Sequence, residues 1–487
     1  MKTTAFFRLA LTVFILSCND SDSDQKKSIS YSADIQPIFT KNCTDAGCHA
    51  ASQSKPNTIG LSKTAHSDTI LVLTDYHYLT EGSGGEGNAI IPFEPSLSHL
   101  FQHINTDPNK SPMAEPTMPK GKSPLSASDQ QIIYDWIADG ARNDNGKAMY
   151  SDHLQGQFII TNQAEDFVSL LNIESGFISR IFPLFKPTWP TPSALEAPHF
   201  IRVSPDKKSA YVSLIVSGKL MKIDLASGAV VNSLLLGGSP AHIELSTDGK
   251  TAVISDFSSN NRILIVDLVS FTLKKTISDI KNNPHAIELM DDNLTLYAAG
   301  NVSDLLYKIN IVSGDKETFR LSGNTPVIGE TTPKLEPYHI QYSSAKNRLY
   351  ISCRKSNEIR VWNPETLTTT DSIKTGTTPL LFDINPAQTE LWVPNRSSNS
   401  ISVINLTTQT VTSTISNLPS EPHGLKFNAA GTIVGLTCEN LKGSPDQHHP
   451  TTRGGSPGIF VLLDASTKTV IKSKEVGSFA AGIDFLP

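Results

Sequence analysis

The sequence predicts a mainly β protein, in which a seven-bladed β-propeller follows a small all-α domain. Beyond about residue 150, short apolar runs alternate with turns rich in Ser, Asn, Gly and Asp, which is typical of β-strands. These runs recur with a period of about 42 to 44 residues, the length of one propeller blade. Before residue 150, apolar residues instead recur at helical spacing, so the two parts are expected to fold separately.

Length and charge limit the possible classes of protein. At 487 residues the chain is longer than one hydrophobic core normally supports, so at least two domains are expected. Its formal net charge is −6 and only 18% of its residues are charged. Because DNA and RNA require a basic stripe or patch that contacts phosphates, a nucleic-acid partner is not expected.

Residues 1–18 have the build of a secretion signal. Positively charged residues precede an apolar run over 9–16 that is too short to span a bilayer and that ends in Ile-Leu-Ser-Cys. This ending resembles the lipobox of bacterial lipoproteins, which implies that Cys18 carries a lipid and that 19–30 form a flexible tether. The exported protein is then expected to be anchored to a membrane, on the periplasmic side of the outer membrane or at the cell surface. The alternative is that Cys18 belongs to an uncleaved signal.

A cluster of cysteines and a histidine lies near the start of residues 31–146. Apolar residues at helical spacing follow Ser32 as a cap and lead to the sequence Cys43-Thr-Asp-Ala-Gly-Cys48-His49. Covalent haem attachment needs two thiols and an adjacent imidazole for the iron, so we predict one haem c with His49 as its proximal ligand. Four residues separate the cysteines, where two are usual. A disulfide between Cys43 and Cys48 is the alternative.

A second segment of the same domain supports this prediction. It contains Met118 before a Pro, then a Ser126 cap, then the run QIIYDWIADGA over 131–141. Together with the cysteine cluster, this order resembles the c-type cytochrome domains of planctomycete and Bacteroidetes proteins. The resemblance implies that Met118 is the distal haem ligand, and a thioether suits an electron-transfer iron. Met113 is the second choice. The histidines of the connecting stretch are expected to be surface or loop residues: His66, His77, His99 and His103.

A Pro starts the innermost strand of each of six complete repeat units in the predicted propeller, residues 150–487. These residues are Pro198, Pro240, Pro284, Pro337, Pro379 and Pro422. A stretch around 325–336 interrupts the period. A seventh blade is predicted from two fragments, with later strands from 157–184 and a first strand from 482–485. Pairing these fragments closes the ring and removes free sheet edges.

The repeats also carry a family resemblance. The stretch Leu391–Asn405, which reads LWVPNRSSNSISVIN, resembles the YVTN family of propellers, and the resemblance extends over about residues 156–487. It implies the fold but no particular activity, because this fold hosts many unrelated functions.

Histidines gather at the starts of the innermost strands. His199, His285 and His423 directly follow the Pro, whereas His242 and His339 lie one place later. Because alternate strand residues point in opposite directions, we expect three of these side chains on one side and two on the other. We predict that this set binds copper or another second cofactor. The alternative is that the imidazoles hydrogen-bond to channel water or to the backbone.

The ends of the second strands are expected on the same face of the propeller. These positions are Asp256, Cys353, Arg354, Asn395, Arg396, Cys438 and Glu439, with the loop 440–458 that carries His448 and His449. Cys353 and Cys438 belong to nonadjacent blades, so they are expected to be buried free thiols.

Three functions fit these patterns. The first is a haem-binding electron-transfer lipoprotein, an electron carrier or oxidoreductase subunit. Its haem exchanges electrons with a redox site or a small-molecule substrate at the propeller face, and with a redox partner protein. The second is a propeller that binds a protein or glycan while the cytochrome serves a partner. A lactonase-like hydrolase ranks last, because hydrolysis does not require a haem.

Overall fold

The computed structural model describes residues 29–44, 49, 71–82, 87–151, 156–185, 194–323, 333–443 and 451–487. The predicted signal with Cys18 and most of the predicted tether lie outside these residues, as do Cys48, His66, His448 and His449. Within the described ranges, no helix is long and apolar enough to cross a membrane.

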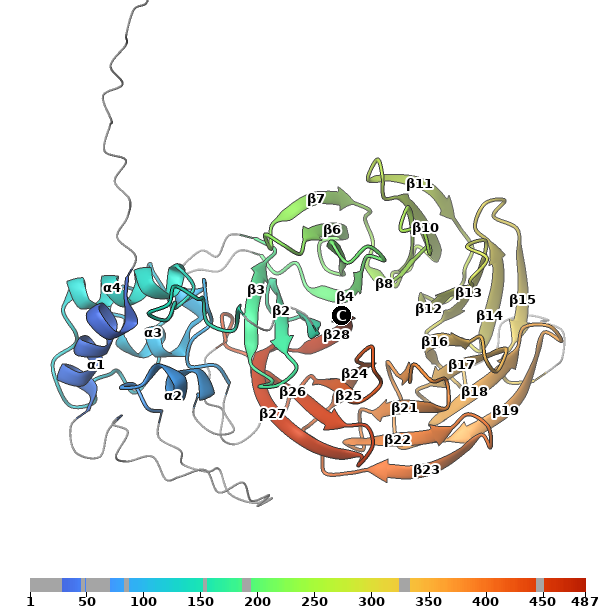
Figure 1. Ribbon diagram of the computed structural model, residues 1–487. Coiled ribbons are helices and arrows are strands. Elements are labelled where there is room, and N and C mark those ends of the chain that lie inside the picture. The colour runs from blue at the N-terminus through green and yellow to red at the C-terminus, as the bar shows by residue number, and fades with distance from the viewer. Residues whose placement is uncertain are drawn as a thin grey trace, which may run out of the picture.

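Seven four-stranded antiparallel sheets surround a central axis, which confirms the predicted mainly β, seven-bladed fold (Figure 1). We number the blades along the chain. Blade 1 contains β4 (Pro198–Val203), β5 (Ser209–Leu214), β6 (Lys219–Asp224) and β7 (Val230–Leu235). Blade 2 contains β8 (Pro240–Leu245), β9 (Thr251–Asp256), β10 (Arg262–Asp267) and β11 (Thr272–Ile277). Blade 3 contains β12 (Pro284–Leu289), β13 (Thr295–Gly300), β14 (Leu305–Asn310) and β15 (Lys316–Arg320).

The remaining blades follow the same order, with the innermost strand first. Blade 4 contains β16 (Pro337–Ser343), β17 (Arg348–Cys353), β18 (Glu358–Asn363) and β19 (Thr368–Lys374). Blade 5 contains β20 (Asp383–Ile384), β21 (Glu390–Asn395), β22 (Ser400–Asn405) and β23 (Thr410–Ile415). Blade 6 contains β24 (Pro422–Phe427), β25 (Ile433–Cys438), β26 (Pro457–Asp464) and β27 (Thr469–Ser478). Blade 7 contains β28 (Ala480–Leu486), β1 (Gln157–Asn162), β2 (Phe167–Asn172) and β3 (Ile178–Pro183).

Blade 7 closes the ring from both ends of the propeller segment, as predicted. β28 pairs antiparallel with β1, and Phe158 lies opposite Phe485. Since β1 also pairs with β2, the junction leaves no free edge on either side of β1.

The innermost strands share an irregularity directly after their first residue. In blade 1, Pro198 lies opposite Leu214 and Phe200 lies opposite Ser213, so His199 is an extra residue in the strand. This arrangement is a β-bulge, in which two residues face one on the neighbouring strand. The same register shift follows the Pro of four other blades: Pro240, Pro284, Pro337 and Pro422.

Blade 5 departs from the predicted pattern. Its innermost strand is reduced to β20, and Pro379 forms only an isolated bridge with Asn395. The predicted start at Pro379 is therefore in place, but the strand pairing between Pro379 and Asp383 is interrupted.

Apolar side chains fill the spaces between neighbouring blades. Trp392 of blade 5 packs edge-on against Phe427 of blade 6, with ring centroids 5.5 Å apart. Phe158 of blade 7 lies 5.7 Å from Phe460 of blade 6 by the same measure. The hydrophobic core is thus a set of contacts that repeats around the ring.

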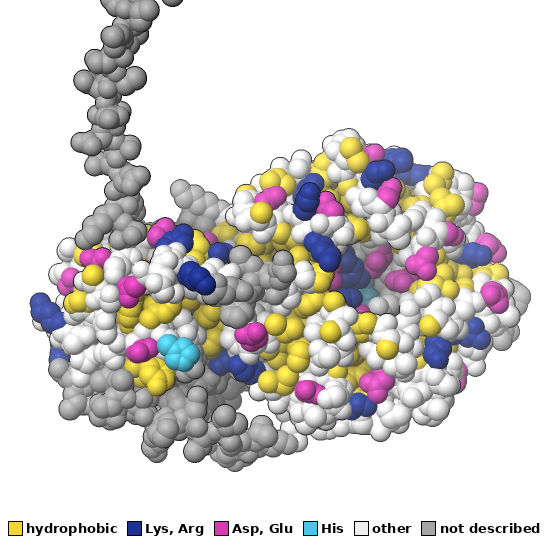
Figure 2. Space-filling model, in the orientation of Figure 1, with side chains coloured by type: hydrophobic (Ala, Val, Ile, Leu, Met, Phe, Trp, Pro, Cys, Tyr) yellow, Lys and Arg dark blue, Asp and Glu magenta, His cyan; other side chains and the backbone are white. Residues whose placement is uncertain are grey.

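Each blade also places a polar side chain at the fourth position after the start of its innermost strand. We call this set the inner ring; it comprises Arg202, Glu244, Glu288, Gln341, Asp383, Lys426 and Asp484. Figure 2 shows the hollow at the propeller centre with cationic and acidic side chains around it.

Inner-ring side chains form polar contacts between several pairs of neighbouring blades. A carboxylate oxygen of Asp484 accepts a hydrogen bond from the Val203 N–H at 2.8 Å. Glu288 accepts from the Tyr342 N–H of blade 4 at the same distance. The inner ring therefore contributes polar contacts between blades where apolar packing ends.

The helical unit lies beside blade 7 (Figure 1). It contains η1 (Tyr31–Ile35), α1 (Gln36–Cys43), α2 (Tyr76–Glu81), η3 (Pro95–Leu97), α3 (His99–Ile104) and α4 (Ala127–Ala138). Its core is apolar and includes the fully buried rings of Phe39, Phe101 and Trp136.

The helical unit confirms one predicted helix cap and corrects two other expectations. The predicted cap of α4 is present, because Ser126 Oγ accepts a hydrogen bond from the Asp129 N–H. The expected Ser32 cap is wrong: the helical segment begins earlier, and Ser30 Oγ accepts from the Ala33 N–H. His99 and His103 are not loop residues; they lie partly buried on α3, with their Nε2 atoms 2.6 Å apart.

The helical unit contacts the outer edge of blade 7. The Asn88 side chain donates to the Ile178 carbonyl and accepts from the Ile178 N–H, at 2.8 and 2.7 Å. The Arg180 guanidinium lies 3.9 Å from the centre of the Phe93 ring. Asn88 therefore pairs with the outermost strand β3 as a further strand would.

Loss of apolar contact in the closing strand should destabilise the protein. Ile483 is buried in β28, so Ile483→Ala is expected to lower the free energy of unfolding by about 2 to 5 kcal/mol. Ile471, which is 44% exposed in β27, provides the matched control. Ile471→Ala should change the free energy of unfolding by less than about 0.5 kcal/mol. Urea denaturation measures both values. Equal effects of the two substitutions would contradict the closure of the ring by β28.

The pH dependence of stability should reveal the raised pKa of Glu288. Burial, and then the neighbouring charge of Glu244, raises the pKa of Glu288 well above its usual 4.5. Between these two pKa values the folded state holds a proton that the unfolded chain has lost, so stability falls as pH rises through this window. Glu288→Gln removes this pH dependence. Relative to the natural chain, its free energy of unfolding should rise by about 1.4 kcal/mol for each pH unit inside the window.

Urea denaturation between about pH 5 and pH 9 tests this difference. Glu317→Gln, the same substitution at an exposed position of β15, provides the matched control. A pH-independent effect of Glu288→Gln would contradict the raised pKa.

Candidate metal site on the propeller axis

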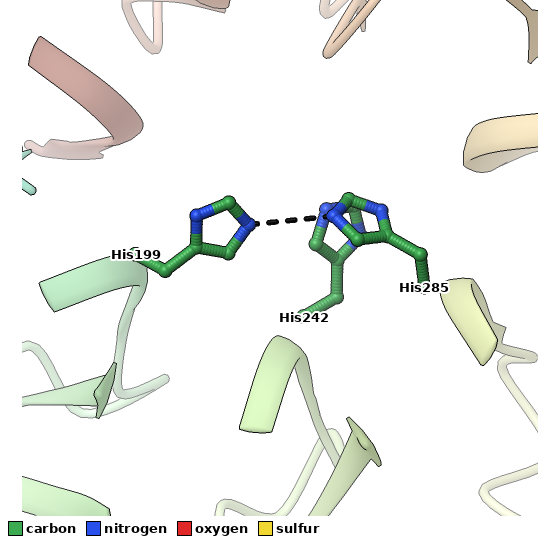
Figure 3. A group of neighbouring side chains, drawn as sticks. All are labelled: His199, His242 and His285. Carbon is green, nitrogen blue, oxygen red and sulfur yellow. Dashed lines mark hydrogen bonds between the residues drawn. The ribbon is translucent and has the colours of Figure 1, made fainter. Parts of the chain in front are cut away.

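Three histidines from consecutive blades meet on the propeller axis. His199 comes from β4, His242 from β8 and His285 from β12, and one ring nitrogen of each lies within 4.8 Å of those of the others (Figure 3). All three side chains are buried. A set of three converging imidazoles is a common arrangement for a transition-metal ion.

The predicted division into three and two histidines is wrong. His242 was expected to point away from His199 and His285, yet its ring centroid lies 4.3 Å from that of His285. The bulge after the first residue explains the difference, because two successive residues face one partner and the strict alternation is lost.

The other two histidines lie at the border of this group. The His423 ring centroid is 6.2 Å from that of His199, and the His339 centroid is 5.4 Å from that of His242. We call the five residues the axial histidine cluster.

Oxygen acceptors orient the outer nitrogens of several of these rings. His285 Nδ1 donates to the Tyr338 carbonyl at 2.9 Å, and His199 Nδ1 donates to Gln163 Oε1 at 2.7 Å. With the proton on Nδ1, each Nε2 carries a lone pair, and the two Nε2 atoms face each other at 3.4 Å. Histidines that ligate metals are typically held in this way, with an acceptor that fixes the tautomer.

His242 is the member of the cluster whose ring nitrogens lack hydrogen bonds. Its side chain has no exposed surface, and neither ring nitrogen has a hydrogen-bond partner in the part of the chain that the structure describes. Its ring stacks on Phe200 with the centroids 4.3 Å apart. A buried polar group without a partner costs on the order of 1 to 3 kcal/mol, which a bound metal ion would offset.

The electrostatics of the cluster favour neutral imidazoles. Burial, followed by the nearby His423, lowers the pKa of His199 to about 3. Burial and the neighbouring histidines lower the pKa values of His242 and His285 well below 6.5. The lone pairs are therefore available at neutral pH without displacement of protons.

A charged network lies next to the cluster. His423 Nδ1 donates to Glu439 at 2.6 Å, and Arg396 forms hydrogen bonds to both Glu439 oxygens. Burial alone would raise the pKa of Glu439, but the hydrogen bonds from Arg396 and His423 outweigh it and hold this pKa at about 2. Glu439 and Arg396 thus lie at the predicted face, and the carboxylate fixes His423.

Sequence reasoning missed the aromatic and amide partners of the cluster. Tyr338 stacks on His285 with ring centroids 4.2 Å apart, and its hydroxyl lies 3.3 Å from His423 Nε2. Tyr338 follows Pro337 directly, which is the position that His199 and His285 occupy in their blades. This equivalence in the sequence could have placed Tyr338 in the cluster. Gln163 lies between two strands and has no comparable signal.

The two cysteines of the propeller are free and buried, as expected. Cys353 lies opposite Pro337 and Cys438 lies opposite Pro422. Burial raises the pKa of both thiols, so neither is a ready thiolate ligand.

The structure places part of the predicted haem site in the helical unit. Cys43 is buried at the end of α1, and its carbonyl accepts from the His49 N–H at 3.0 Å. His49 Nδ1 donates to the Leu71 carbonyl at 2.8 Å, which leaves Nε2 as the lone-pair nitrogen. Met118 packs against the same core as Cys43, whereas Met113 is 54% exposed. These residues fit the chemistry of a haem ligand set, although Cys48 lies outside the described residues.

Comparisons with known proteins support the fold. The family model "Lactonase, 7-bladed beta-propeller" matches residues 290–423. A functionally unknown protein from Desulfotomaculum acetoxidans is 13% identical with a TM-score of 0.53, over 68% of this chain and 98% of that chain. Dihydro-haem d1 dehydrogenase is also 13% identical, with a TM-score of 0.48, over 82% of this chain and 94% of that chain. No curated protein matches. What the comparisons show is the seven-bladed propeller fold.

Proposed function

We propose that this chain is an electron-transfer protein whose axial histidine cluster holds one redox-active transition metal. The observation that carries the proposal is the convergence of His199, His242 and His285, whose ring nitrogens lie within 4.8 Å of one another. Imidazole nitrogen suits copper, iron, nickel and zinc, and of these copper and iron exchange single electrons readily. Copper is our first choice, because three neutral imidazoles without a carboxylate in the group suit it well.

The helical unit is proposed to carry one c-type haem that relays electrons. Cys43 and Cys48 would hold the haem covalently, His49 would be its proximal ligand and Met118 its distal ligand. The hydrogen bond from His49 Nδ1 to the Leu71 carbonyl supports this role, because it leaves Nε2 as the nitrogen that would bind the iron. A bound haem would supply reversible one-electron transfer.

The setting of the protein is proposed from the N-terminal sequence. Cys18 would carry a lipid that anchors the exported chain to a membrane, so that the haem meets a redox partner protein there.

A lactonase-like hydrolase is the second candidate, favoured by the partial family-model match over 290–423. Hydrolysis requires neither a redox-active metal nor a haem. The presence of copper and of haem therefore separates the two functions.

Removal of a central ligand should abolish metal binding. We expect the full chain to bind one copper ion, and His242→Phe to weaken this binding at least about 100-fold while the ring volume stays similar. Inductively coupled plasma analysis gives the stoichiometry, and competition with a chelator gives the affinity. His77→Phe on exposed α2 provides the matched control and should bind copper as the natural chain does. Equal affinity of the two variants, or no copper in either, would favour the hydrolase.

Removal of the distal ligand should change the haem spectrum. Met118→Ala is expected to abolish the thioether-to-iron charge-transfer band and to lower the reduction potential, because methionine ligation raises the potential. Met113→Ala is the matched control and should leave both unchanged. If the band instead persists in Met118→Ala and disappears in Met113→Ala, the ligand assignment is wrong.

A further inference from the structure

A cavity of about 280 Å³ lies in the propeller channel beside the axial histidine cluster. The inner ring lines it together with apolar side chains and His339; the apolar residues are Phe200, Leu381, Phe382, Leu425 and Ile483. Phe200 stacks directly on His242, so one wall of the cavity adjoins the proposed metal site. The lining is mainly charged and polar, with the apolar side chains as a smaller part, and the volume is larger than a bare ion needs.

The charges around the cavity do not balance. The inner ring contains four carboxyl groups but only two cations, Arg202 and Lys426. Both cations are paired, Arg202 with Glu244 at 2.9 Å and Lys426 with Asp383 at 3.1 Å. An anionic ligand would therefore have to displace an ion pair.

Glu288 feels the charges of Arg202 and Lys426, but neither cation is in direct contact with it. It accepts one hydrogen bond from the Tyr342 N–H and forms no ion pair within the described residues. Asp484, by contrast, accepts hydrogen bonds from two backbone N–H groups, those of Val203 and Phe485. Burial and the nearby Glu244 disfavour the ionised form of Glu288 and raise its pKa, so a positive ligand group beside these two side chains would stabilise the carboxylate.

His339 also lines the cavity, on the side of the axial histidine cluster. It is only 6% exposed, and its ring forms part of the cavity wall there.

We propose that this cavity binds a small alkylammonium ion. Its charged end lies beside Glu288 and Glu244, its hydrocarbon part contacts Phe200 and Leu381, and His339 contacts it from the side of the histidine cluster. The binding goes beyond the proposed electron-transfer function and does not require the metal. Only the use of such an amine as a substrate would depend on that function.

Isothermal titration of the full chain with butylammonium tests the proposal. Butyrate and butanol have nearly the same size but are negative and neutral, so butylammonium should bind at least about tenfold more tightly than either. Glu288→Gln keeps the acceptor for the Tyr342 N–H and should weaken butylammonium binding about tenfold, as should Glu244→Gln. Glu317→Gln is the matched exposed control and should have no effect.

Two further measurements separate this proposal from the metal site. His242→Phe should lose copper but keep butylammonium binding, whereas Glu288→Gln should keep copper. Equal or tighter binding of butyrate, or unchanged affinity in both Gln variants, would overturn the proposal. Displacement of butylammonium by an equal concentration of Mg²⁺ would also overturn it, because the cavity would then be a metal-ion site.

Discussion

The β-bulge after the first residue of the innermost strands determines what lies on the propeller axis. In a regular strand, successive side chains alternate between the two faces of the sheet. The extra residue breaks this alternation, so the first and second positions after the Pro both approach the channel. His199 and His285 use the first position and His242 uses the second, yet they form one group. Without the bulge, the same residues would be split between the channel and the blade interior.

The same repeat serves two chemical purposes at different depths of the channel. At the first two positions, imidazoles and the Tyr338 ring pack together, next to the ion pair of Glu439 and Arg396. At the fourth position, the inner ring brings carboxylates and cations together and contacts the neighbouring blade at several places around the ring. The backbone is nearly seven-fold symmetric, but the side chains are not. This asymmetry is what allows a propeller to hold a defined site on its axis.

The sequence predicted the blades well because Pro, turn residues and apolar alternation are local signals. The starts of β4, β8, β12, β16 and β24 lie at the predicted Pro residues, and β28 closes the ring with β1. The direction of His242 was not predictable in the same way, since a bulge depends on the register between two strands. Gln163 was missed because its role arises only when blade 7 and blade 1 meet. Pro379 shows the reverse case, in which a correct local signal starts a strand that pairs only in part.

The contact between Asn88 and Ile178 has a consequence for how the whole molecule holds together. Blade 7 is built from both ends of the propeller segment, and it is also the blade on which the helical unit rests. The helical unit covers the outer edge strand, while β28 occupies the innermost place in the same sheet. Separation of the helical unit would therefore expose an edge of the sheet that closes the ring. The strand that the helical unit covers and the strand that closes the ring thus belong to one four-stranded sheet, at its two opposite edges.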